Sequence, residues 1–226
     1  MHNSDPTSIA QPSAHQTWLR FLNYGILALI GLEVGLAIAY LSSSLIHGAS
    51  PDFLDFNGLR TLPSLIQAVQ LFLIGAIALG LLICSRQLNH RLSPVVLICI
   101  ALLCGFGGFD ELFKIHLTFK QFNLKGIYLG LLTAIPVLCW KDLIRLWRSH
   151  RDTLMWVGAG MAVFLLGGFG AEFLKDGFAA LFNGQDAETV AFALERTRVT
   201  IEELAELIGE TIIIYGMGRF VIQLLD

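Results

Sequence analysis

Long apolar blocks, separated by short polar stretches that contain helix-breaking residues, make up most of this 226-residue sequence. A helix that crosses the roughly 30 Å hydrocarbon core of a bilayer needs about 20 predominantly apolar residues. The six blocks cover residues 18–46, 65–84, 93–117, 126–140, 154–175 and 200–224, and the fourth could continue to Trp147. The sequence therefore predicts an all-α integral membrane bundle of about six transmembrane helices, with the lipid bilayer as its surroundings.

The composition supports a membrane protein and argues against two other classes. The chain is 55% hydrophobic and only 15% charged, whereas soluble domains contain about 25% charged residues. Its formal net charge is −3 and it has no run of basic residues, which excludes nucleic acid as an expected partner. The four cysteines all lie inside apolar blocks without a C-x-x-C pair. We expect them to be small core residues rather than disulfide partners or thiolate ligands.

The ends of the chain and the loop charges give a topology. Residues 1–17 are polar and are predicted to be a disordered tail, which leaves residues 18–226 as one transmembrane domain. The first apolar block is too long for a signal peptide and is expected to be retained. Basic residues are slightly enriched in the second and fourth loops, near Arg91 and Arg148. This bias favours the plasma (cell inner) membrane with both termini in the cytoplasm. A helix cap at Asp186 could start the last helix early, beyond the membrane.

Several ionisable residues lie inside the apolar blocks, where a charge costs about 2.5–3.5 kcal/mol on insertion scales. The candidates for a metal or cation site are Asp110, Glu111 and His116 in the third block, Glu172 in the fifth, and Glu203, Glu206 and Glu210 in the sixth. The third and fifth helices run in one direction and the sixth runs back. All of these residues should therefore lie near the same face of the membrane, where the three helices could share a site.

Helix geometry decides which of these residues can act together. At 100° per residue, Glu203, Glu206 and Glu210 lie within about 60° of one another and form an acidic stripe. Glu111 and His116 are about 140° apart on a regular helix. A site that uses both requires the third helix to end near His116, or ligands that come from different helices.

A plainer interpretation is local charge pairing. Lys114 follows Glu111 by three residues and Lys175 follows Glu172 by three, which are pairing distances on a helix face. Glu206 and Glu210 have no such helical neighbour, and this favours a functional or interhelical role for them. For Glu33, isolated in the first block, we expect an interhelical hydrogen bond or a protonated carboxyl group.

Glycines recur in the blocks, including Gly31 and Gly35 and the clusters at residues 105–108 and 167–170. Small residues let membrane helices approach closely, and tight packing is the main interpretation of these glycines. The alternative is that the two clusters leave room for a ligand beside the carboxylates.

Two short motifs resemble a family of uncharacterised bacterial multi-pass membrane proteins. Their pattern has D-E-x-x-x-x-H-E at the end of one helix and E-E-x-x-E-x-x-G before an apolar run in a later helix. Here the first motif starts at Asp110, with Leu117 in place of the final Glu, and the second spans residues 202–209. The resemblance implies no activity, but it implies that the acidic and histidine positions belong together.

Three functions fit these observations. The first is a cation-handling protein that binds or transports protons or a divalent metal ion. Oxygen ligands suit hard cations, and one imidazole would widen the choice towards Mn, Fe or Zn. The second is an intramembrane metal-dependent enzyme, built from carboxylates and His in a helical bundle. The third is a structural or assembly subunit whose carboxylates bind another membrane protein. A homo-oligomer is compatible with all three functions.

Overall fold

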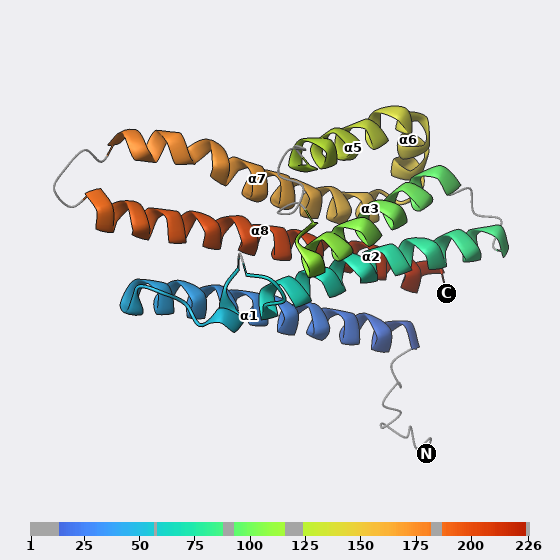
Figure 1. The fold of residues 1–226 in the computed structure, drawn as a ribbon. Helices are drawn as coiled ribbons and strands as arrows, with labels where there is room; N and C mark the ends of the chain where they lie inside the picture. Colours follow the sequence, from blue (N-terminus) through green and yellow to red (C-terminus); the bar gives the residue numbers. More distant parts are fainter. Residues whose placement is uncertain (1–13, 57, 88–92, 116–123, 182–186, 225–226) are drawn as a thin grey trace, which may run out of the picture.

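The computed structural model is a bundle of helices (Figure 1) and describes residues 14–56, 58–87, 93–115, 124–181 and 187–224. The elements are α1 (Ala14–His47), a short 3-10 helix η1 (Asp52–Leu54), α2 (Leu62–Gln87), α3 (Pro94–Phe113), α5 (Leu124–Leu138), α6 (Trp140–Ser149), α7 (Arg151–Leu181) and α8 (Ala187–Leu224). The described part of the chain contains no strand. The all-α prediction is therefore confirmed. α1 begins inside the stretch that we expected to be a disordered tail, so residues 14–17 are helical.

Four of these helices, α1, α2, α3 and α8, are long and apolar enough to cross a membrane. Together α5 and α6 could supply a fifth crossing. α7 coincides with the predicted fifth block, although the side chains of residues 171–181 lie outside the description. The membrane class is thus supported by length and composition, whereas the count of about six spans stays a prediction.

The possible continuation of the fourth block to Trp147 is present as a second helix, α6, rather than as an extension of α5. The chain bends by 69° between α5 and α6. Pro136 lies inside α5, where it has no N–H to donate and its ring displaces the carbonyl one turn earlier. The last hydrogen bond of α5 runs from the Cys139 N–H to the Ile135 carbonyl at 2.9 Å, and α6 starts directly afterwards.

α8 is the central helix and packs against α7, α1 and α2. Glycines bring α7 and α8 together. A Cβ atom added to Gly209 would lie 2.8 Å from the Gly160 carbonyl oxygen, and one added to Gly167 would overlap the side chain of Ala205. Close packing is therefore the role of these glycines. By contrast, Gly31 in α1 has no described atom within 4 Å of such a Cβ.

The long helices extend past α2 and α3 at one end of the bundle (Figure 1). α8 has 38 residues, or about 57 Å at 1.5 Å per residue, well above the thickness of the hydrocarbon core. Its extended part carries ion pairs from Arg198 to Glu195 and Glu202. Its start at Ala187 matches the expected early beginning of the last helix. α1 begins and α8 ends at the other end of the bundle, which agrees with termini on one side. The cytoplasmic assignment stays a prediction.

Two apolar clusters hold the bundle together. One joins α2, α3 and α8 around Ile74 and Met217. The other joins the end of α1 to α8 around Tyr40 and Leu207. A layer of polar side chains from α1, α2 and α8 lies at the level between them. The candidate site is in this layer.

Candidate functional site

One part of the polar layer joins α1, α2 and α8, and we call Glu33, Gln70 and Thr211 the Glu33 centre. The Gln70 side-chain N–H group donates to Glu33 Oε1 at 2.8 Å and to the Thr211 hydroxyl at 2.6 Å. The Thr211 hydroxyl donates to the same Glu33 oxygen at 2.5 Å. All three side chains are buried. The Glu33 carboxyl group thus accepts from two neutral donors and links three helices, as expected for an interhelical carboxyl.

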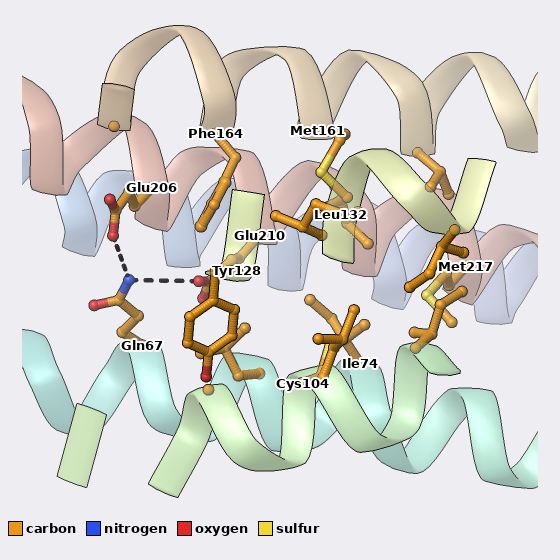
Figure 2. Close-up of a pocket in the computed structure, with 18 of the residues that line it drawn as sticks. Gln67, Ile74, Cys104, Tyr128, Leu132, Met161, Phe164, Glu206, Glu210 and Met217 are labelled. Carbon is orange, nitrogen blue, oxygen red and sulfur yellow. Dashed lines mark hydrogen bonds between the residues drawn. The ribbon is translucent and has the colours of Figure 1, made fainter. Parts of the chain in front are cut away.

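A second part, the Glu210 centre, consists of Gln67, Glu206 and Glu210. The Gln67 side-chain N–H group donates to Glu206 Oε2 at 2.9 Å and to Glu210 Oε1 at 3.5 Å, so one amide bridges two carboxyl groups (Figure 2). Glu206 and Glu210 are one turn apart on α8 and project to the same side. The side chain of Glu210 is only 1% exposed.

α3 ends before the predicted third block does, close to the Glu210 centre. α3 stops at Phe113 because Lys114 adopts a left-handed conformation with φ of 44°. The Lys114 ammonium group then lies 2.6 Å from Glu111 Oε2, with both side chains largely shielded from solvent. The predicted pairing of Glu111 with Lys114 is therefore observed. Lys114 also lies close enough to Glu203 and Glu206 to interact with them electrostatically.

A half-enclosed cavity of about 310 Å³ lies between α2, α3, α5, α6, α7 and α8. Figure 2 shows Gln67, Glu206, Glu210 and Tyr128 at one end, with Leu132, Met161, Ile74 and Met217 along the rest. Asp110 and Glu111 also line it. Two buried atoms of lining residues, Glu210 Oε2 and the Tyr128 hydroxyl oxygen, have no hydrogen-bond partner.

The structure brings four of the predicted site residues together, and the side-chain positions of two others are not described. Asp110, Glu111, Glu206 and Glu210 come from α3 and α8 to a single cavity. Glu203 is half-buried and interacts electrostatically with Glu111 and Glu206 without lining the cavity. His116 and the side chain of Glu172 lie outside the described residues. The prediction that the third, fifth and sixth blocks share a site is therefore untested for Glu172 of α7. Among the described side chains, no three His, Cys, Asp or Glu residues are placed to hold a metal ion.

Sequence reasoning did not identify Gln67, Gln70, Thr211 and Tyr128 as part of the site. The sequence argument rested on ionisable groups, whereas these four side chains are uncharged. A signal was available, because two glutamines three residues apart at the start of an apolar block place two amides on one side of a membrane helix. Tyr128 could be recognised only from the fold, since its hydroxyl lies in the space next to Gly107 of α3.

The glycine cluster of α3 also has a packing role. A Cβ atom on Gly108 would lie 2.8 Å from the Phe72 ring, and one on Gly107 would lie 3.2 Å from Leu71. These glycines therefore let α2 approach α3, as the main interpretation expected. Gly107 also lines the cavity beside the carboxylates, as does Gly168 of the second cluster, so the alternative interpretation of these glycines stays open as well.

Apolar helices of membrane-crossing length around a buried polar layer fit an α-helical membrane protein. The chain belongs to the family described as a domain of unknown function (DUF8692), which matches residues 24–219. No curated protein and no solved structure matches the chain. Membership of an uncharacterised family agrees with the resemblance suggested by the motifs. The bacterial origin and the motif assignment stay predictions.

Proposed function

We propose that this protein binds a cation within the membrane at the Glu210 centre, with proton exchange on Glu210 as the elementary step. The observation that supports the proposal is the buried Glu210 Oε2 atom, which has no hydrogen-bond partner and belongs to a residue that lines the cavity. An isolated carboxylate in an apolar interior costs far more than its neutral form. The group is therefore stable when it holds a proton or when a cation from the cavity neutralises it.

The surroundings of Glu210 favour exchange over permanent neutralisation. Its Oε1 atom accepts a hydrogen bond from Gln67, a neutral amide, at 3.5 Å. Glu206 and Glu111 both interact with it electrostatically, and their negative potential attracts a positive ion. Carboxyl groups at membrane depth that face a cavity are typical of cation pathways and proton relays. Binding at this centre is thus the kind of step that carriers and proton-coupled transporters use.

A divalent metal ion stays a second hypothesis for the same centre. Ca²⁺ takes about six to eight oxygen ligands and Mg²⁺ about six, whereas the Gln67 amide joins only two carboxyl groups, Glu206 and Glu210. A metal site would need further ligands such as His116 and Glu172. We therefore favour a proton or an organic cation.

Infrared difference spectroscopy of the protein in lipid nanodiscs tests the proposal. As the pH is raised, the carbonyl band of a protonated carboxyl group should lose intensity in the parent protein. Glu210→Gln should lack this loss, because a glutamine cannot exchange the proton. Glu195→Gln is the matched control, since Glu195 lies on the same helix in an exposed ion pair with Arg198.

The proposal would be wrong if the parent and Glu210→Gln gave the same pH-difference spectrum while both remained folded by circular dichroism. Metal analysis of the purified parent and of Glu206→Gln addresses the metal hypothesis separately. A metal that copurifies with the parent and is lost from the variant would replace the proton as the bound cation.

A further inference from the structure

The cavity beside Glu210 contains far more apolar surface than a proton or a metal ion would need. Ile74, Leu132, Met161 and Met217 form its walls away from the carboxyl groups (Figure 2). These residues come from α2, α5, α7 and α8, so four helices contribute to the apolar part. Its volume of about 310 Å³ is at the lower end of the roughly 300–1,000 Å³ that is usual for small-molecule pockets.

The polar end of the cavity has a defined hydrogen-bonding character. Carboxylate oxygens are acceptors only, and a phenolic hydroxyl both accepts and donates. Glu210 Oε2 and the Tyr128 hydroxyl are both buried and unpaired there. An ammonium group carries three N–H donors and a positive charge, and its bonds to a carboxylate are charge-assisted. An anionic head group would instead meet Asp110, Glu111 and Glu206, which also line the cavity. Lys114 pairs with Glu111, so these three acidic side chains and Glu210 face a single nearby lysine and the balance of charge favours a cation.

We propose that this cavity binds an amphipathic amine, with the protonated amino group at Glu210 and the hydrocarbon part along Leu132, Met161 and Met217. This inference rests on the proposed function and names the cation class that the site takes. Methionine side chains are flexible and polarizable, and they adapt to apolar ligands of varied shape. The cavity is half-enclosed and has apolar walls, which suits a ligand with a hydrocarbon part.

Photolabelling of the full chain in phosphatidylcholine nanodiscs tests the inference. The probe is decylamine with a diazirine on its chain, compared with the decanol and decanoic acid that carry the same group. The amine should label the α5 and α7 peptides that line the cavity, about tenfold more than either analogue, because only its head group makes charge-assisted bonds. Glu210→Gln should reduce amine labelling to the level of the alcohol.

A second variant tests the apolar part without touching the carboxyl group. Met161→Trp should narrow the apolar part of the cavity and reduce amine labelling, although it changes no residue of the Glu210 centre. Met155→Trp is its control, because Met155 is an exposed residue of the same helix and lies outside the cavity. It should label like the parent.

The outcomes separate the two proposals. The amine inference would be overturned by equal labelling with amine and alcohol, by undiminished labelling in Glu210→Gln, or by Met161→Trp and Met155→Trp behaving alike. In each of these cases a pH-difference signal that depends on Glu210 would leave the proposed cation binding standing. Loss of that signal alone would remove the proposed function.

Discussion

Two glutamines three residues apart on α2 hold two carboxyl centres that look alike in sequence and differ in surroundings. Gln70 donates to Glu33 and Thr211, and none of these three residues lines the cavity. Gln67 donates to Glu206 and Glu210, and all three line it. Each centre leaves one carboxyl oxygen unpaired, Glu33 Oε2 in one and Glu210 Oε2 in the other.

The difference between the centres is therefore the space beside the unpaired oxygen. Around Glu33 the helices are packed, and a neutral carboxyl group that links α1, α2 and α8 is the least costly arrangement. Glu210, by contrast, lines a cavity, and this is where the proposed proton or ligand would bind. Glu33 and Glu210 are the same residue type and are almost equally buried. The comparison therefore indicates that the adjacent cavity, and not burial alone, gives a buried acid a binding role.

The largest effect should follow from disturbing α8, because that helix carries members of both centres. Gly209 lies between Glu206 and Glu210, and an added Cβ there would be 2.8 Å from the Phe164 backbone nitrogen in α7. Gly209→Ala should force α7 and α8 apart and lower the free energy of unfolding by about 1–3 kcal/mol, the usual cost of overpacking. Thermal unfolding in detergent, followed by circular dichroism, measures this loss.

Gly31→Ala is the matched control, since its added Cβ would have no described atom within 4 Å. There the higher helix propensity of alanine should leave stability unchanged or raise it by up to about 1 kcal/mol. If both variants lost the same stability, the glycine contact between α7 and α8 would not be what positions the two centres.

The next effect should distinguish the centres directly. Gln70→Leu removes the donor to Glu33 and Thr211 in a packed region, so the free energy of unfolding should fall by about 1–3 kcal/mol. Gln67→Leu should cost less, because water in the cavity can replace the amide bond to Glu206 and Glu210. Denaturant titration in mixed micelles gives both values, and equal losses would contradict the distinction between a packed centre and a ligand-accessible one.

Much of this architecture follows from the sequence because the bilayer restricts the chain so strongly. Apolar blocks of about 20 residues can only satisfy their backbone groups in lipid as helices or closed barrels, and this is why the helix positions were predictable. The direction of successive helices also placed Asp110, Glu111, Glu206 and Glu210 near one level, where the structure has them around one cavity.

The remaining features depend on contacts that no local pattern encodes. Glu33 contacts α2 and α8 only because the helices are arranged around α8. The apolar pattern of a helix does not indicate which other helices are its neighbours. The end of α3 at Lys114 depends on a single left-handed residue that is not glycine. The cavity itself is the space that six helices leave unfilled, so it exists only in the packed structure.

The smallest effect, and the sharpest test of the Glu33 centre, should come from Glu33→Gln. A glutamine carbonyl oxygen can accept the same bonds from Gln70 and Thr211 that Glu33 Oε1 accepts. If Glu33 is neutral in the native protein, the change in the free energy of unfolding should stay within about 0.5 kcal/mol at acidic pH, where the unfolded chain also keeps the proton. At higher pH the variant should become the more stable protein, because only the parent then releases a proton on unfolding. Denaturant titration at two pH values measures it.

The same variant should keep the pH-dependent infrared signal and the amine labelling of the parent, because both are assigned to Glu210. A signal lost in Glu33→Gln as well as in Glu210→Gln would join the two centres into one proton-binding unit. A destabilisation that grows as the pH rises would show instead that Glu33 is ionised in the folded bundle, and its unpaired oxygen would then require a cation of its own.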